Sequence, residues 1–542
     1  MMWALMGAIL VGLVGLSVDF ARAQALRAQL QNAADGAALV AERSSNESIA
    51  ERTEAARAFF EAEMSDRPMD GLSFVVEQMP DGGHRVSASV NMPVGLAGIV
   101  QNRDWRIGVS SEAQSEASPP IEVALVLDNT YSMAHDIGAL RGAANDLVDM
   151  LLGLDGDAVS VGLVPFETMV NIGNQSSHLA WMDTTGEAPY NGELLEDRLI
   201  TREYTNNRRN NGDCNHLDTE VGNSPYEIVW VHSGRYCYGY NPSDINYFRL
   251  FDATPNVAWG GCVEARPEPY DVMDTPPVVG NPSTRWVPFF WIDDSDTTGG
   301  VLNDWLDDRT LPPGTLQDGG RTLSVFKYDG SNGSIDNSPP FTSGPNRGCP
   351  TPIVPLTTSR ATIRSAINDM EVISGGGTNS AVGLAWGWRV LSPGAPFTQG
   401  RDPNVEDVRK VIVLMTDGEN TNMNATSEDD LLESPYNAYG FRGQWTNFAA
   451  DMPAQYRRSI SDSESSYVSY VNSRMRELCD NLKDDDVEIY TIVFRDPSRS
   501  IRDLLRTCAT DADHAFTADN ASELQQAFRV IGTGIGKLRL TR

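Results

Sequence analysis

The chain has 542 residues, of which 41% are hydrophobic, so it is long enough for two or three structural units or for one unit with large insertions. Its formal net charge is -32, from 74 acidic and 42 basic side chains. Because such a chain repels phosphate backbones and no basic stripe offsets that repulsion, the composition argues against nucleic-acid binding.

The N-terminal residues form an apolar segment. Residues 1–16 read MMWALMGAILVGLVGL, and the first charge is Asp19. A run of roughly 17 to 25 such residues can cross a bilayer as a helix, which predicts a transmembrane anchor. A cleaved signal peptide is the alternative, because the Ala-Arg-Ala at 21–23 resembles a small-x-small cleavage site. Apolar residues then continue at three- and four-residue spacing, which predicts one long helix over 1–43.

The segment 44–118 is predicted to contain a helix followed by a small β-rich unit. Its runs FVVEQ, HRVSASVNM and WRIGVS alternate between apolar and polar residues, as half-buried strands do. A turn signal at 80–83, Pro-Asp-Gly-Gly, separates two of these runs. The prolines at 119–120 then mark a domain boundary.

Strands and helices alternate from residue 119 to the end of the chain. The run IEVALVL is apolar at every position but Glu122, as a strand buried on both faces requires. We expect strands at 121–127, 159–166, 411–415 and 487–494, and helices near 137–153, 379–391, 466–483 and 520–535. This alternation predicts an α/β fold over 119–542 with a doubly wound, mostly parallel sheet. Two stretches without periodicity, at about 180–350 and 420–465, are interpreted as insertions.

The six cysteines include no CxxC pair of metal-ligand spacing, which indicates disulfides in an oxidising compartment. Four of them fall in the first insertion: Cys214, Cys237, Cys262 and Cys349. Three pairings of these four are possible. The same insertion is rich in tryptophan, notably Trp230, Trp259, Trp286, Trp291 and Trp305. We interpret them as the insertion's own core, with a partner-binding surface as the alternative.

Polar side chains follow the ends of two predicted strands. Asp128, Thr130 and Ser132 occupy alternate positions after the strand at 121–127, and Asp417 follows the strand at 411–415. Thr378 lies in a glycine-rich loop that opens a helix. Open α/β sheets place ligand sites at the carboxyl ends of their strands, and hard divalent cations prefer such oxygen ligands. The sequence therefore predicts a divalent-metal site made of these five residues.

The three pieces together resemble the metal-ion-dependent adhesion site of von Willebrand factor type A domains, which has a DxSxS loop, a GGxT loop and a strand ending in TDG. The resemblance implies that Asp128, Thr130 and Ser132 form the first motif, Thr378 the second and Asp417 the third. It implies magnesium as the metal, with calcium or manganese as alternatives. The chain departs from the family at Thr130, commonly serine, and at residue 131, a tyrosine where the family commonly has glycine.

The two ends of the chain resemble a second family. The run GLVGLSVDFARAQALRAQLQNAADGAALVAE and the C-terminal QAFRVIGTGIGKLRLTR are similar to TadE/TadG-like proteins of the Flp (tight-adherence) pilus system. The resemblance implies a single-pass inner-membrane protein with its bulk in the periplasm, which assists pilus assembly or anchoring through protein partners. It also implies a disulfide between Cys479 and Cys508, which flank the run VEIYTIVF.

Two other functions remain open from the sequence. One is a cell-surface adhesin unrelated to pili, and the other is a metal-assisted hydrolase that uses Asp128 and Asp417. Enzyme activity is not expected, because no histidine lies in a nucleophile or zinc motif. His135, just beyond the metal loop, is interpreted as a surface or helix-start residue, with a supporting role beside the metal ligands as the alternative. The segment 294–299 has the carboxylate spacing of a calcium loop, but Trp305 stands where its closing glutamate would bind.

Overall fold

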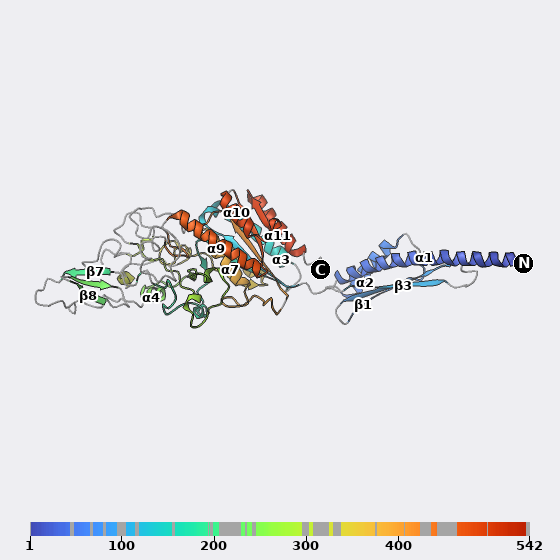
Figure 1. Cartoon of the computed structure of the whole chain (residues 1–542), viewed down its shortest axis with the longest axis horizontal. Helices are drawn as coiled ribbons and strands as arrows, with labels where there is room; N and C mark the ends of the chain where they lie inside the picture. The colour runs from blue at the N-terminus through green and yellow to red at the C-terminus, as the bar shows by residue number, and fades with distance from the viewer. Residues whose placement is uncertain are drawn as a thin grey trace. The chain divides into compact units, whose positions relative to one another are not determined.

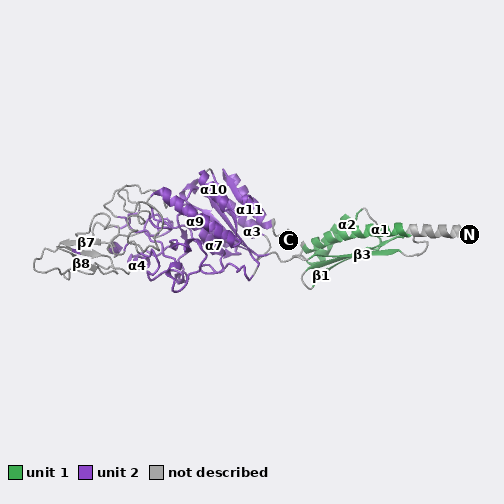
Figure 2. Cartoon of the chain, viewed as in Figure 1, with its two compact units in different colours: residues 1–118, 542 green, residues 119–541 purple. Residues whose placement is uncertain are grey.

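The computed structural model (Figure 1) divides into two compact units, residues 1–118 with 542 and residues 119–541 (Figure 2). The structure describes residues 2–43, 48–65, 69–79, 83–94, 104–113, 119–153, 158–192, 195, 199–204, 229–233, 236–240, 245–294, 303–306, 325–328, 338–373, 377–405, 407–422, 435–441, 463–495 and 497–537. Side chains of 2–15 and most of those in 199–240 lie outside this description.

Unit 1 packs two helices against an antiparallel three-stranded sheet. Its elements are α1 (Met2–Arg43), α2 (Ile49–Glu63), β1 (Ser73–Gln78), β2 (His84–Met92) and β3 (Trp105–Ala113), with strand order β1-β2-β3. Alternate residues of β2 are buried, and together with alanines of α1 they form one hydrophobic core. The long helix and the β-rich unit predicted from the sequence are thus both present, and they form a single unit.

Among the described residues, no helix combines the length and the apolar character that a bilayer-spanning segment needs. The predicted anchor falls mainly on residues 2–15, whose side chains lie outside the described part of the structure. Membrane anchoring therefore stays a prediction.

Unit 2 is built on a six-stranded sheet with the order β11-β5-β4-β13-β15-β16. These strands are β4 (Ile121–Asp128), β5 (Val159–Phe166), β11 (Val354–Thr357), β13 (Arg409–Thr416), β15 (Glu488–Phe494) and β16 (Ala515–Ala518). All neighbours run parallel except the edge strand β11, which is antiparallel to β5. In chain order this is the doubly wound arrangement 3-2-1-4-5-6, so the predicted α/β fold with a mostly parallel sheet is confirmed.

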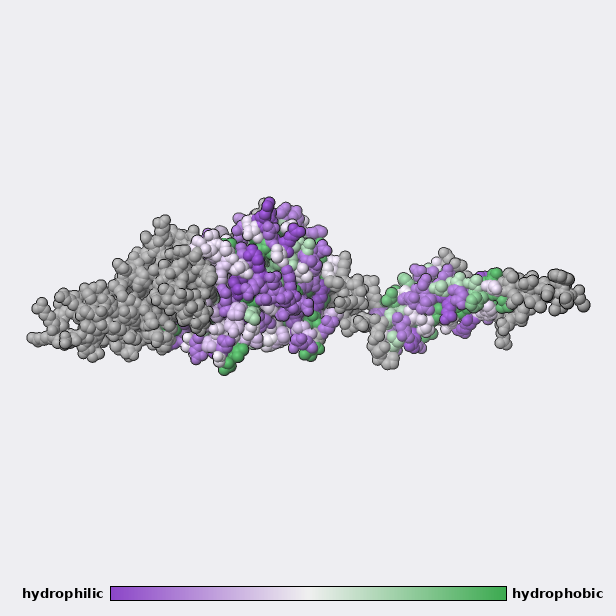
Figure 3. Space-filling view, viewed as in Figure 1, coloured by the Kyte–Doolittle hydropathy of each residue, from purple (hydrophilic) through white to green (hydrophobic). Residues whose placement is uncertain are grey.

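Helices cover both faces of this sheet. One face packs against α3 (Ile137–Leu151), α6 (Arg360–Asn368) and α11 (Ala521–Lys537), and the other against α7 (Ser380–Leu391), α9 (Glu464–Asp484) and α10 (Arg499–Cys508). Successive strand residues serve opposite faces, since Leu125 belongs to the first core and Val126 to the second. The central strands are mainly apolar because both of their faces are buried. The outer surface visible in Figure 3 is mainly hydrophilic over the described part of this unit.

The first insertion extends the core on the α7 face. Its strand β10 (Cys262–Val263) pairs with β6 (Val170–Asn171), which precedes the insertion. The insertion also contains the strands β7 (Leu199–Tyr204), β8 (Val229–Ser233) and β9 (Tyr236–Tyr240), and helix α4 (Tyr247–Ala253). Trp259, Trp286 and Trp291 are buried in the same cluster as α7, which confirms the core interpretation for these three residues. The side chain of Trp230 lies outside the described residues.

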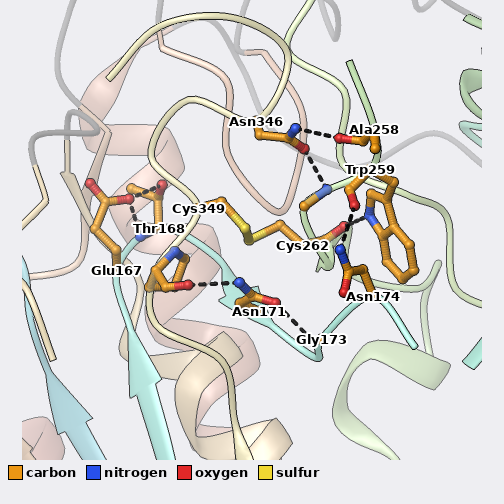
Figure 4. The surroundings of a disulfide bond; sticks show 12 residues. Glu167, Thr168, Asn171, Gly173, Asn174, Ala258, Trp259, Cys262, Asn346 and Cys349 are labelled. Atoms are coloured by element: carbon orange, nitrogen blue, oxygen red, sulfur yellow. Dashed lines mark hydrogen bonds between the residues drawn. A yellow bond between two sulfur atoms is a disulfide. The ribbon is translucent and has the colours of Figure 1, made fainter. Parts of the chain in front are cut away.

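A disulfide between Cys262 and Cys349 closes much of this insertion, with a sequence separation of 87 (Figure 4). Beside it, the Trp259 indole donates to the Cys262 carbonyl at 2.6 Å, and the Asn171 amide donates to the Pro350 carbonyl at 2.8 Å. Closing a loop of this length stabilises the fold by roughly 4–5 kcal/mol through the unfolded state. The disulfide thus joins β10 to the C-terminal end of the insertion, and β10 itself pairs with β6, just after β5.

The other described cysteines are also oxidised. Cys237 is disulfide-bonded, and Cys479 on α9 is bonded to Cys508 at the end of α10, with their Cα atoms 5.1 Å apart. No free cysteine occurs among the described residues. The disulfide implied by the TadE/TadG resemblance is therefore present in the structure.

Candidate functional site

Asp128 ends β4 at the point where the strand order reverses between β4 and β13. Its side chain is fully buried, and both carboxylate oxygens accept hydrogen bonds. Oδ1 accepts from the Thr130 amide at 2.9 Å and from the Thr130 hydroxyl at 2.6 Å, whereas Oδ2 accepts from the Thr416 hydroxyl at 2.6 Å. The carboxylate is thus held rigidly in the crevice where doubly wound sheets place ligands.

A short chain of polar contacts joins Asp128 to Asp417 across this crevice. The hydroxyl oxygens of Thr130 and Ser132 lie 2.9 Å apart, and the Ser132 hydroxyl donates to Oδ1 of Asp417 at 2.7 Å. Residues 131–135 form a 3-10 turn, and Tyr131 points outward with 69% of its side chain exposed. Four of the five predicted site residues are therefore brought together.

Thr378, the fifth predicted residue, lies beside the same loop. It belongs to β12 (Gly377–Thr378), which pairs with β14 (Thr421–Asn422). Its hydroxyl oxygen lies 3.5 Å from the position that a Cβ atom on Gly418 would occupy. The β12–β14 pairing consequently places the Thr378 hydroxyl next to the residue that follows Asp417.

Asn379 connects this loop to the sheet. Its amide donates to the carbonyl of Glu167, just beyond β5, at 2.9 Å, and its side chain caps α7 by accepting from the Val382 amide at 3.1 Å. The next amide, that of Ser380, donates to the Asn420 side chain at 2.7 Å. Residues 374–376 of the predicted glycine-rich loop lie outside the described part of the structure.

The site is electrostatically unbalanced as it stands. The pKa of Asp128 is raised to about 7, mainly by burial and in second place by the charge of Asp417. Burial also raises the pKa of Asp417, although the Ser132 hydroxyl and Arg495 act in the opposite direction. Two neighbouring carboxylates in a low-dielectric crevice favour either a shared proton or a bound cation.

Two residues at this edge were not predicted from the sequence. Thr416 bonds to Asp128 only because β13 and β4 pair in the register that places Met415 opposite Leu127, which a single sequence does not reveal. Arg495 follows β15 and forms an ion pair with Asp136. The strand-end rule that found Asp417 would have identified Arg495 as well. His135 is exposed, in agreement with its interpretation as a surface residue.

The donor set suits a hard divalent cation. Two carboxylates and three hydroxyls supply oxygen only, as magnesium prefers. No group of three or more His, Cys, Asp or Glu side chains arranged to hold a metal is found in the described part of the chain.

The segment with calcium-loop spacing, 294–299, is described only at its first residue. Asp294 is buried, and its carboxylate accepts a hydrogen bond from the Asn303 amide at 2.6 Å. Residues 295–299 lie outside the described residues.

Fold and site together define a doubly wound α/β domain with an oxygen-rich cluster at its topological switch point. At the other end of the chain, residues 1–57 match the Tad family model, which describes Flp pilus-assembly TadE/G-like proteins. A search of curated proteins found no match.

Among solved structures, the chain is similar to the pilus adhesin SpaC from Lactobacillus rhamnosus GG, at 12% identity and a TM-score of 0.30, over 87% of this chain and 35% of that chain. It is also similar to the vWF domain of a type V pili tip protein from Porphyromonas gingivalis, at 10% identity and a TM-score of 0.30, over 78% and 96% of the two chains. The chain spans only about a third of the SpaC structures. TM-scores of this size do not establish a shared fold, so the site is defined by its own geometry.

Proposed function

We propose that this protein is a membrane-anchored periplasmic binding protein that assists assembly or anchoring of Flp pili through metal-dependent contacts with protein partners. The TadE/G-like segment at 1–57 supports the pilus context. The disulfides support an oxidising compartment.

The observation that carries the metal site is the contact between the hydroxyl oxygens of Thr130 and Ser132, at 2.9 Å. Each hydroxyl donates its proton to a carboxylate, Thr130 to Asp128 and Ser132 to Asp417. Neither has a proton left for the other, so lone pairs face each other when both carboxylates are ionised. A cation bound by these oxygens removes that repulsion.

In this proposal Asp128, Thr130, Ser132, Thr378 and Asp417 hold magnesium, directly or through water. The bound ion supplies a coordination position that an acidic side chain of the partner completes. Binding rather than hydrolysis is favoured because both oxygens of Asp128 already accept hydrogen bonds and so are poorly placed to act as a general base.

Metal binding is tested first on the purified full chain, by titration with Mn²⁺ followed by electron paramagnetic resonance of the free ion. Asp417→Asn is expected to weaken binding by more than about tenfold, since it removes a charged ligand. Asp503→Asn, on the exposed face of α10, is the matched control and should bind as the wild type does. Equal affinity in the two variants would refute the site.

The pilus role is tested in cells that carry these same variants. Partners cross-linked to the protein, and surface pili, should be lost with Asp417→Asn and kept with Asp503→Asn. Identical partner sets in magnesium, in chelator and in Asp417→Asn would rule out metal-mediated contacts. Normal piliation in a deletion strain would instead favour an adhesin that is independent of pili.

A further inference from the structure

A fully buried lysine–aspartate pair lies in the first insertion, away from the candidate metal site. Lys327 and Asp293 have no exposed side-chain surface, and Nζ of the lysine lies 3.1 Å from Oδ2 of the aspartate. Lys327 belongs to a 3-10 turn, Val325–Tyr328, and Tyr328 packs edge-on against Phe290 at 5.4 Å. Burying two opposite charges in such surroundings is costly, so a reaction that removes both of them is favoured.

The two oxygens of the Asp293 carboxyl group have different environments. Oδ1 accepts two backbone hydrogen bonds, from Trp305 at 2.6 Å and from Leu306 at 2.7 Å. Within the described residues, Oδ2 accepts no hydrogen bond and faces the lysine. Two fixed backbone donors on one oxygen are the arrangement that stabilises a tetrahedral oxyanion. Oδ1 is thus placed as the oxyanion and Oδ2 as the leaving oxygen.

Protonation of Asp293 is compatible with this chemistry. Burial raises the pKa of Asp293 to about 6, although Lys327 and the backbone donors act in the opposite direction. The lysine also donates a hydrogen bond to the backbone carbonyl of Asp293, which fixes Nζ beside the carboxyl group. The amine is therefore held beside the carboxyl group, in contact with Oδ2 and with the backbone carbonyl of the same residue.

We propose that Lys327 and Asp293 condense into an intramolecular isopeptide bond. One ammonium proton moves to Oδ2, which gives the neutral amine and the neutral acid. The Nζ lone pair then attacks Cγ, and negative charge develops on Oδ1 between its two backbone donors. The Cγ–Oδ2 bond breaks, a second Nζ proton goes to the departing hydroxyl, and water leaves. An N–C bond forms, and neither an oxidant nor any other co-reactant is needed.

Position and burial both favour this condensation. Holding the reacting groups in contact corresponds to effective concentrations of about 10⁵–10⁸ M. The amide product also removes both charges from the apolar interior. The bond closes a loop between positions 34 residues apart. It would cross-link two short segments of the loop-rich insertion, and reducing agents would not break this bond.

A second buried pair in the same unit serves as an internal comparison. Nζ of Lys410 lies 3.6 Å from Oε2 of Glu122, but within the described part of the chain a single backbone donor, the Arg401 amide at 2.9 Å, reaches Oε1. The Arg401 guanidinium lies 3.8 Å from the same carboxylate and stabilises its charged form. We therefore expect no condensation between Lys410 and Glu122.

The test is the intact mass of the purified full chain after reduction and alkylation. The wild type should weigh less than its sequence by the mass of one water, and fragmentation should locate a branched peptide that joins Lys327 to Asp293. Lys327→Met and Asp293→Ala should each restore the full mass. Lys410→Met should keep the deficit.

A wild-type chain of full mass would overturn the proposal, and so would a deficit that persists in Lys327→Met or maps to another pair. Because the decisive measurement is made on the wild type, a folding defect in a variant does not affect the conclusion.

Discussion

At the residue scale, Glu488 joins the start of β13 to the turn before β16. Its carboxylate accepts two hydrogen bonds from Arg409, at 2.7 and 2.8 Å, and its Oε1 lies 3.0 Å from the His514 ring. Burial acts to raise the pKa of Glu488, but Tyr490, Arg409 and His514 outweigh it, so the pKa lies below its usual value. The ionised carboxylate therefore stabilises the folded state.

This lowered pKa predicts a pH dependence of stability. The contribution of Glu488 is fully present above the unfolded-state pKa of about 4.3 and is lost as pH falls through the lower folded-state pKa. Glu488→Gln should therefore unfold at lower urea near neutral pH and lose less stability than the wild type on acidification. Urea midpoints measured across this range test the prediction, with Asp480→Asn, exposed on α9, as the control. Parallel acid profiles for wild type and Glu488→Gln would contradict it.

The predicted site residues illustrate what a sequence can and cannot define at this scale. Asp128 and Asp417 could be predicted because each lies just after an apolar run, and the carboxyl ends of parallel strands meet at the same edge of the sheet. The contact of Thr416 with Asp128 could not be predicted, since it depends on strand register. The proximity of Thr378 to Gly418 likewise depends on the pairing of two-residue strands from distant parts of the chain.

At the element scale, the predicted strands and helices are those with a strong local pattern. Strands β4, β5, β13 and β15 are mainly apolar, and α3, α7, α9 and α11 are long enough to show helical periodicity. Four elements of the same sheet and its helical layers were not predicted: β11, β16, α6 and α10. The first two have only four residues each, and short helices are stabilised mainly by tertiary packing, which a local pattern does not reveal.

The pairing of β12 with β14 offers a test of positioning that leaves every proposed ligand in place. A Cβ atom on Gly377 would lie 2.1 Å from the Thr421 carbonyl oxygen, so alanine there must push the two strands apart. Gly377→Ala should weaken Mn²⁺ binding about tenfold or more, because Thr378 moves away from Asp417.

The matched control for this substitution is Gly142→Ala, in the middle of α3. An added Cβ there meets no atom within 4 Å, and alanine stabilises a helix by roughly 0.5–1 kcal/mol relative to glycine. It should raise the urea midpoint and leave Mn²⁺ affinity unchanged. Wild-type affinity in Gly377→Ala would mean that Thr378 does not contribute to the site.

At the scale of the whole molecule, the hydrophobic cores follow the division into two units. The core of unit 1 consists of residues between Leu30 and Ala113, and both cores of unit 2 consist of residues after Pro120. Burial of apolar surface, the dominant stabilising contribution, is therefore arranged separately in each unit.

This separation predicts that unit 2 folds and binds metal without unit 1. A chain that begins at Pro119 should match the full chain in Mn²⁺ affinity, and its buried sheet should unfold at the same urea concentration, since β4 and every proposed ligand are retained. A chain that begins at Val159 is the control. It lacks β4 and α3, so β5 and β13 lose the strand that lies between them, and it should not fold. If the Pro119 chain instead unfolds earlier or binds Mn²⁺ more weakly, unit 1 must contribute to the stability of the site, and the division of the cores would not describe how the protein folds.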